Sequence, residues 1–479
     1  MRERKLFIAV ILCFMFSGFA ALLYQTAWLN KLGVIFGTSH IAVATVLAAY
    51  MAGLAFGAAV AAKFAHRVKR PILVYGVLEA VIGISAMLVP VLLDGAQALL
   101  VILYGDQPQP VSAHAFAQTL YYLVATFLIL AIPTGAMGAT LPLLSRYAVT
   151  EDRQVGPRVG LLYGINTVGA VFGALMAGFL LLPHLGLIGT LAVGAGVNVL
   201  VFFLAIYLAR TAGSQKTQPQ ADEDTTPAPP RSGQYVPQHW IMPVMLASGA
   251  VSFTLEVLWT RLLSHIFGGT VYAFAIMLAC FLSGIALGGL FAGRLAQRRD
   301  SACLFFGGAQ LLIAIISYVS YSLIDSWLPA GSGLGGRALY AFLIIVPSTI
   351  FIGATYPLAV RIATTRADDT ASISGSIYAW NTLGAIIGAL LTGFIILPSL
   401  GFGPTLKVAM IVSVSLAMLV AFFAKPRQSP VLATSVAVLL AIAFLVFPAR
   451  PDGLIYSHVA SQDEWGKEHF YAVGHSATI

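Results

Sequence analysis

Apolar stretches of about 20 residues alternate with short polar connections along most of the chain. The hydrocarbon core of a bilayer offers a backbone no hydrogen-bond partner, so a chain crosses it as a helix, and about 20 residues are needed to span it. Thirteen runs of this kind are present, at residues 6–28, 41–62, 71–93, 119–144, 159–182, 186–208, 240–262, 271–293, 301–324, 338–360, 375–397, 403–424 and 431–447. The pattern predicts an all-α polytopic membrane protein.

Polar segments divide these runs into units. The segment 210–239 is rich in Pro, Gln, Thr and Asp, and it predicts a flexible cytoplasmic linker between a first membrane repeat at 1–209 and a second at 240–425. The last and shortest run predicts an extra, thirteenth transmembrane helix within 426–447. A polar tail follows at 448–479 and is interpreted as the start of a soluble domain.

The two membrane units are an internal duplication. Residues 17–58 align without a gap onto 248–289 with 14 identities in 42 positions, and residues 160–186 align onto 375–401 with 15 in 27. Six spans is an even number, so both copies enter the membrane in the same direction. The sequence therefore predicts two parallel six-helix repeats, which is the symmetry of the major facilitator halves.

Composition and charge fit a membrane protein. Hydrophobic residues make up 59% of the 479 positions, and Asp, Glu, Lys and Arg make up only 9%, against about 25% in soluble domains. Basic residues lie in alternate connections, all on the side of the N-terminus. This predicts a multi-pass protein of the inner (plasma) membrane with a cytoplasmic N-terminus and an external tail. The bias also explains the formal charge of +8 without a nucleic-acid partner.

No cofactor, metal site or catalytic residue is expected. Cys13, Cys280 and Cys303 lie inside apolar runs without metal-ligand spacing, so they are interpreted as packing residues. The glycines between Gly331 and Gly336 resemble a phosphate-binding loop. Their flanks are two membrane spans, however, and not the strand and helix that such a loop requires.

Two carboxylates inside the runs are candidates for a functional site. A charged group in the membrane interior is costly, so Glu79 in the third run and Glu256 in the seventh each need a reason. The repeat places Gln310 opposite Glu79 and Gln25 opposite Glu256. Each half thus has one carboxylate and one amide, with the roles exchanged. Two interpretations remain open: hydrogen-bonded joints between the first and third helices of each half, or a proton or cation pathway in which both carboxylates face one cavity.

Two further pairs stand at matched positions of the fifth and eleventh runs. Asn166 follows Tyr163 by three residues, and Asn381 follows Tyr378 in the same way. All four side chains are candidates for substrate binding or for a proton or cation pathway, and a buried hydrogen-bonding role is the alternative.

Three strings carry a family resemblance. They are Ser248-Gly249 through Leu255-Glu256 with Trp259-Thr260-Arg261, Gly353-Ala354-Thr355-Tyr356-Pro357, and Tyr378 through Gly384. Over roughly residues 10–425 the chain resembles the membrane portion of fused major facilitator/spermidine synthase proteins. The resemblance implies a soluble aminopropyltransferase-like domain after the helices, and Tyr471 to Ile479 is similar to the approach to its first strand. The glycine loop and acidic catalytic residue of such a domain are not in this sequence.

Two functions follow as hypotheses. The first is a transporter-like protein that moves a small polar or cationic solute by alternating access of its halves, with polyamines implied by the resemblance. The second is a membrane anchor or scaffold for a spermidine synthase-like aminopropyltransferase whose catalytic domain is absent from this chain or separately encoded. Intrinsic enzymatic activity is disfavoured because no nucleophile or metal constellation is present. The expected partners are the lipid bilayer, the solute and that separate domain.

Overall fold

The computed structural model describes residues 2–36, 40–104, 115–211, 240–267, 271–296, 299–324 and 333–424. The linker beyond Thr211, the predicted span at 431–447 and the tail lie outside the described residues. The predictions made for them stay predictions.

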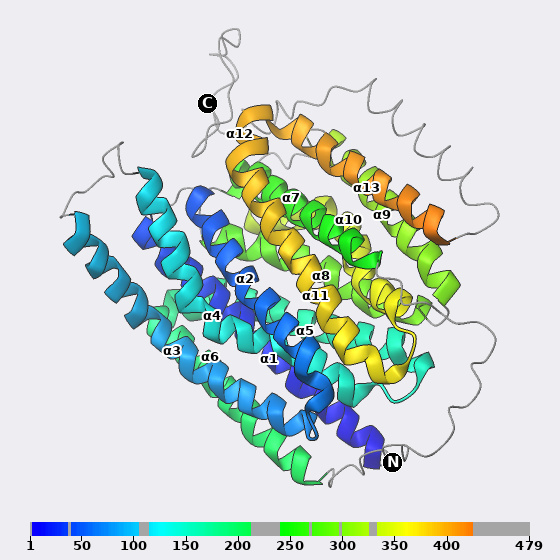
Figure 1. The fold of residues 1–479 in the computed structure, drawn as a ribbon. Coiled ribbons are helices and arrows are strands. Elements are labelled where there is room, and N and C mark those ends of the chain that lie inside the picture. The colour runs from blue at the N-terminus through cyan, green and yellow to red at the C-terminus, as the bar shows by residue number, and fades with distance from the viewer. Residues whose placement is uncertain are drawn as a thin grey trace, which may run out of the picture.

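Long helices make up the described part of both halves (Figure 1). The first half contains α1 (Arg2–Phe36), α2 (His40–Phe64), α3 (Pro71–Tyr104), α4 (Ala115–Ala148), α5 (Val155–Met176) and α6 (Leu182–Thr211). The second contains α7 (Ile241–Phe267), α8 (Val271–Leu295), α9 (Arg299–Ser322), α10 (Leu334–Ala363), α11 (Thr370–Leu391), the short α12 (Leu397–Leu400) and α13 (Phe402–Ala424). Short 3₁₀ turns occupy Ala65–Arg67, Asp152–Gln154 and Ala367–Asp369, and π-turns occupy Ala177–Leu181 and Thr392–Ile396.

Two glycines turn the chain back at equivalent places of the repeat. The helical stretch Asp152–Thr211 has 60 residues, which at 1.5 Å per residue would be about 90 Å long, some three times the thickness of a bilayer core. Gly186 breaks it with φ 64° and ψ −171°, and Gly401 ends α12 with φ 79° and ψ −176°. Both conformations strain any residue with a Cβ. The eleven membrane-length stretches of the described chain therefore provide twelve crossings, because Asp152–Thr211 crosses twice.

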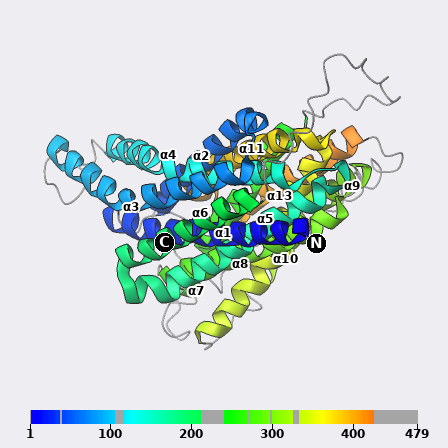
Figure 2. The same cartoon turned by 90° about the horizontal axis from the view of Figure 1, so that it is seen from below.

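The helices of the two halves pack in the same pattern. In the first half α1 packs on α5 and α6, α2 on α4, and α3 on α4 and α6; in the second, α7 packs on α11 and α13, α8 on α10, and α9 on α10 and α13. The halves meet where α5 contacts α8 and where α2 contacts α11. These two interfaces exchange under the repeat. In both Figure 1 and Figure 2, α3 and α9 lie at opposite edges of the molecule.

One end of the bundle is closed by a hydrophobic core that both halves share. This joined core includes Phe14 and Leu144 of the first half and Phe306 and Tyr356 of the second. Towards the other end, the first half has its own cluster around Trp28, and the second half has its own around Trp259. The halves are therefore joined at the end that carries the 3₁₀ turns and the N-terminus, and each is packed mainly on itself at the opposite end.

Glycines let the two halves approach closely at the joined end. A Cβ on Gly160 of α5 would lie 2.7 Å from the Gly289 carbonyl oxygen and 2.8 Å from the Gly293 Cα, both on α8. The backbone amide of Ala367 also donates to Asp152 Oδ1 at 2.7 Å, which links the 3₁₀ turns of the two halves. Small residues at such crossings allow van der Waals packing that larger side chains prevent.

Candidate functional site

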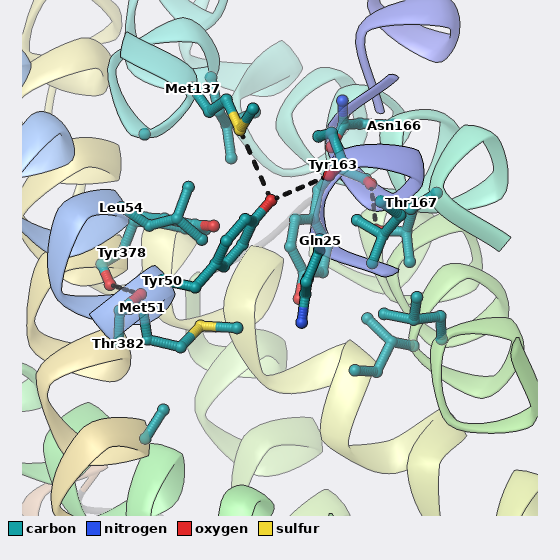
Figure 3. Close-up of a pocket in the computed structure, with 18 of the residues that line it drawn as sticks. Gln25, Tyr50, Met51, Leu54, Met137, Tyr163, Asn166, Thr167, Tyr378 and Thr382 are labelled. Carbon is teal, nitrogen blue, oxygen red and sulfur yellow. Dashed lines mark hydrogen bonds between the residues drawn. The ribbon is translucent and has the colours of Figure 1, made fainter. Parts of the chain in front are cut away.

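A cavity of about 170 Å³ lies between the two halves (Figure 3). Its wall is made by α1, α2, α4 and α5 of the first half and by α7, α8 and α11 of the second. Residues of the joined core, including Phe14 and Leu141, line it on one side. The cavity therefore lies where the shared core gives way to the separate clusters.

Six of the eight candidate residues from the sequence line this cavity. They are Gln25, Tyr163, Asn166, Glu256, Tyr378 and Asn381. The repeat explains why they meet: each residue of the first half has its counterpart on the wall as well, Gln25 with Glu256, Tyr163 with Tyr378 and Asn166 with Asn381. Thr167 and Thr382 form a further matched pair, which sequence reasoning missed although the same alignment contains it.

Glu79 and Gln310 lie elsewhere. Neither is among the residues that line the cavity in the described part of the chain, and both are fully buried within their own halves, on α3 and α9. The expectation that Glu79 and Glu256 face one cavity is thus not met in this structure. The physical reason is that α3 and α9 pack on the outer side of α6 and α13, at the edges of the bundle.

Gln310 forms the kind of contact that the hydrogen-bonding interpretation predicts. Its Nε2 donates to Ser248 Oγ at 2.8 Å, which ties α9 to α7. In the first half, the equivalent Ser17 lies against Glu79. The first and third helices of both halves are therefore joined through a polar side chain at the same place.

Glu256 is the one acidic or basic side chain among the residues found to line the cavity. It is 9% exposed, and no hydrogen bond or ion pair reaches its carboxyl group from the residues that the structure describes. A small recess of about 10 Å³ continues from Glu256 and is lined by Trp259, Thr260, Phe274, Met277, Leu278, Phe281 and Ile345. A space of that size holds about one water molecule or one ammonium group.

Hydrogen bonds, mostly to backbone carbonyl groups, hold several polar side chains of the cavity wall in place. Asn166 Nδ2 donates to the Phe14 carbonyl oxygen at 3.0 Å, which leaves the amide oxygen for other partners. The Thr167 and Thr382 hydroxyls each donate to a carbonyl four residues earlier in their own helix, at 2.8 and 2.7 Å. Tyr50 points its hydroxyl towards the Met137 sulfur at 3.5 Å, as Figure 3 shows.

Three tyrosine rings contact one another where the cavity meets the joined core, one pair tilted by 38° and the other edge-to-face at 87°. The Tyr356 ring lies 4.7 Å from that of Tyr163 and 6.0 Å from that of Tyr378, measured between centroids. The Tyr356 hydroxyl also shares a hydrogen bond of 2.6 Å with Ser374 Oγ. Sequence analysis did not select Tyr356 as a site residue, although it lies inside the Gly353 to Pro357 string. Its repeat counterpart is Leu141, so the alignment gave no polar pair to notice.

Comparison with known proteins identifies the family. Residues 6–389 match the Major Facilitator Superfamily. The chain belongs to the Major Facilitator Superfamily. The prediction of an all-α polytopic membrane protein with a major facilitator-like fold is confirmed. Proteins of this superfamily are transporters that work by alternating access, with a solute site between the two halves. The central cavity of this Major Facilitator chain lies in that place.

Solved structures agree with the fold. The chain is similar to the human organic anion transporter MFSD10 (TETRAN), with a TM-score of 0.55 at 12% identity over 88% of this chain and 100% of that one. It is also similar to the transporter FucP in the outward conformation, with a TM-score of 0.51 at 13% identity over 86% of this chain and 98% of that one. At these identities the likeness shows the fold alone.

One further relative matches a smaller part of the chain. The chain is 26% identical over 183 residues to polyamine aminopropyltransferase 2 of Streptomyces coelicolor, and the match covers 36% of this chain and 31% of that protein. The Major Facilitator chain thus matches about a third of the length of this relative.

Proposed function

We propose that this Major Facilitator transporter moves a small cationic solute, and that Glu256 binds the solute's charged group. The observation that carries the proposal is the isolation of the Glu256 carboxyl group: it lines the central cavity and has no hydrogen-bond or ion-pair partner among the described residues. A buried carboxylate without a partner is costly, and a cation in contact with it removes much of that cost.

The rest of the cavity fits a solute with an apolar body and a few polar groups. Leu22, Leu54, Phe253 and Phe281 provide apolar surface, and Gln25, Asn166 and Asn381 provide amides. Sites for small molecules commonly combine a mostly apolar wall with a few placed polar groups. The recess beside Glu256 includes Trp259, Phe274 and Phe281, and aromatic faces favour a cation as neighbour.

Alternating access requires the two ends of the central cavity to open and close in turn. The halves are joined at the end with the basic connections, so with the predicted cytoplasmic N-terminus this arrangement is the outward-facing one. A solute entering from outside would reach Glu256 at the bottom of the separated region.

The test is uptake into proteoliposomes that contain the purified chain. A panel of radiolabelled solutes should include putrescine, spermidine, a monoamine, a neutral polyol and an organic anion. We expect a cation to accumulate and the polyol and anion to be excluded.

Glu256→Gln should lower the apparent affinity for that cation by about tenfold to a hundredfold, because it removes a charge-assisted contact. The matched variant carries Gln25→Glu together with Glu256→Gln, which moves the carboxylate to the equivalent wall and should restore part of the binding. Uptake of the anion, or full uptake of the cation by Glu256→Gln, would overturn the proposal.

A second candidate function rests on the curated relative. The similarity to a polyamine aminopropyltransferase favours a role as the membrane part of such an enzyme, with polyamines as cargo or product. A polyamine is one of the cations that the first function allows, but only the second function predicts stable association with an aminopropyltransferase. Co-purification of a catalytically active aminopropyltransferase with the chain, without solute accumulation in proteoliposomes, would favour the second function.

A further inference from the structure

Glu79 lies at the centre of a buried polar cluster in the first half. Its Oε2 accepts a hydrogen bond from Asn198 Nδ2 at 2.6 Å, and Asn198 Oδ1 accepts one from the Tyr24 hydroxyl at 2.6 Å. The hydroxyls of Ser17 and Tyr75 lie against the same carboxyl group. Within the described chain, Glu79 Oε1 and the Tyr75 hydroxyl have no hydrogen-bond partner of good geometry.

No basic side chain of the described residues faces this carboxyl group. The groups around it are Cys13, Ser17 and Tyr24 from α1, Tyr75 from α3 itself, and Asn198 from α6. The helix α4 also packs on α3, but its one charged residue, Arg146, donates to the Ala65 carbonyl. A fully buried carboxyl group without a cation is far cheaper to hold as the neutral acid than as the anion.

A single side chain separates this cluster from the central cavity. Ser17 lines the cavity and also lies against Glu79. A serine hydroxyl both donates and accepts a hydrogen bond, so it can receive a proton on one side and release one on the other. The carboxyl group is therefore one hydroxyl away from the space that solute and water enter.

The second half lacks this chemistry at the same place. The repeat sets Gln310 opposite Glu79, Phe306 opposite Tyr75, Leu255 opposite Tyr24, and Ser413 opposite Asn198. The glycine contacts support this equivalence, because Gly76 packs on Ala205 and its counterpart Gly307 packs near Val420, the counterpart of Ala205. Gln310 with Ser248 is enough to join the first and third helices there. The acid, the two tyrosines and the asparagine of the first half therefore need a reason other than joining helices.

We propose that Glu79 is a proton-binding site that exchanges its proton with the central cavity through the Ser17 hydroxyl. In the forward step the Glu79 O–H bond breaks, Ser17 accepts that proton and passes its own to a water molecule in the cavity. The carboxylate that remains is stabilised by the Asn198 amide and by the Tyr75 hydroxyl, which is free to donate to it. In the reverse step a proton from the cavity returns through Ser17 to the Glu79 carboxylate. The site binds a proton whatever the solute is; a role in driving transport rests in addition on the proposed function.

The experiment is infrared difference spectroscopy of the purified chain in lipid, comparing mildly acidic with alkaline buffer and then H₂O with D₂O. We expect carboxylic-acid C=O bands that disappear at alkaline pH. Glu79→Gln should remove one band and Glu256→Gln another, so the two sites are assigned separately. Glu79→Gln copies the natural Gln310 arrangement, and it should therefore fold.

Ser17→Ala should keep the Glu79 band but slow its shift in D₂O by at least tenfold. Ser248→Ala, the matched control in the second half, should leave that rate unchanged.

Three results would overturn the proposal: no acid band that depends on Glu79, a Glu79 band that persists at every pH the fold tolerates, or an exchange rate that Ser17→Ala leaves unchanged. If Glu79→Gln is poorly folded, Tyr75→Phe provides the second measurement. It removes a donor to the carboxylate and should shift the loss of the band to higher pH. None of these readings requires a transported solute, so their outcome is independent of the uptake assay that tests Glu256.

Discussion

Gln25 and Glu256 occupy equivalent positions of the two repeats and both line the central cavity, yet only one of them is able to carry a charge. The cavity therefore has nearly matched walls for shape and amide groups, with Tyr163, Asn166 and Thr167 repeated as Tyr378, Asn381 and Thr382. Charge is what distinguishes the two sides. A cationic group would bind towards the second half, and the rest of the solute would extend towards the first.

The first prediction tests whether charge in the cavity sets the preference for solute. Asn381→Asp adds a second acidic side chain to the wall that carries Glu256. Solutes with two positive charges should gain about tenfold in affinity relative to those with one, because a charged contact contributes more than a neutral one. Competition binding with putrescine and a monoamine measures the ratio. The control is Asn381→Leu, which should weaken both solutes by a similar factor; an unchanged ratio in Asn381→Asp would argue against charge as the determinant.

Much of the fold, and part of the site, could be predicted from the sequence. The hydrophobic runs predicted the membrane crossings, because a bilayer admits only segments whose backbone hydrogen bonds are formed internally. The alignment predicted Gln25 with Glu256 and Asn166 with Asn381 as matched pairs. The alignment also suggested that Glu79 and Glu256 could share a cavity, and this is where it failed. A repeat states which residues are equivalent, but which helices surround the cavity depends on how the two halves dock. That docking places α3 and α9 at the edges.

Tyr356 was missed for a related reason. Its role comes from contacts with Tyr163 of the other half and with Tyr378 of its own, and neither contact follows from spacing along the chain. Ser17 was likewise not selected as a site residue, although it begins the first aligned block of the repeat. Its position between Glu79 and the cavity depends on the rotation of α1, which periodicity did not resolve.

The second prediction concerns the cluster of Tyr163, Tyr356 and Tyr378. Tyr356→Phe keeps the ring contacts but removes the hydrogen bond to Ser374, and it should destabilise the protein by about 1 kcal/mol. Tyr356→Ala also removes the ring, leaves a cavity next to Tyr163 and should destabilise the protein by about 3 to 5 kcal/mol, the cost of truncating a large aromatic side chain in a protein core. Thermal unfolding in detergent, followed by the loss of monodisperse protein, measures both. Equal destabilisation by the two variants would show that the hydroxyl, and not the ring contacts, supports this region.

The third prediction concerns orientation in the membrane. The distribution of basic residues predicts that the linker is cytoplasmic and that the tail lies outside. A cysteine introduced by Gly233→Cys should react with an impermeant thiol reagent only after the membrane is permeabilised, and one introduced by Trp465→Cys should react in intact cells. The three native cysteines are buried and give a low background. Protection of the Trp465→Cys site in intact cells would remove the thirteenth span from the predicted topology.

The last prediction tests closure of the joined end. Gly160 of α5 lies so close to α8 that a Cβ there would be 2.7 Å from the Gly289 carbonyl oxygen, and the contacting atoms are backbone, which has little room to move. Gly160→Leu should therefore disfavour the conformation in which this end is closed and shift the population towards one in which this end is open and the outer end is closed. Thr382→Cys, in the cavity wall, provides the reporter. In the otherwise native chain this cysteine should react with an impermeant reagent added from outside. With Gly160→Leu that reaction should slow about tenfold or more, while labelling from the cytoplasmic face of inverted vesicles increases.

Gly293→Ala, whose Cβ would lie 3.1 Å from the Gly156 carbonyl oxygen, should give a smaller shift in the same direction. Gly196→Leu is the control, because a Cβ at Gly196 meets no atom of the described chain within 4 Å, and it should leave both labelling rates unchanged. If Gly160→Leu is monodisperse but labels like the native glycine, closure at this end does not depend on the α5–α8 contact.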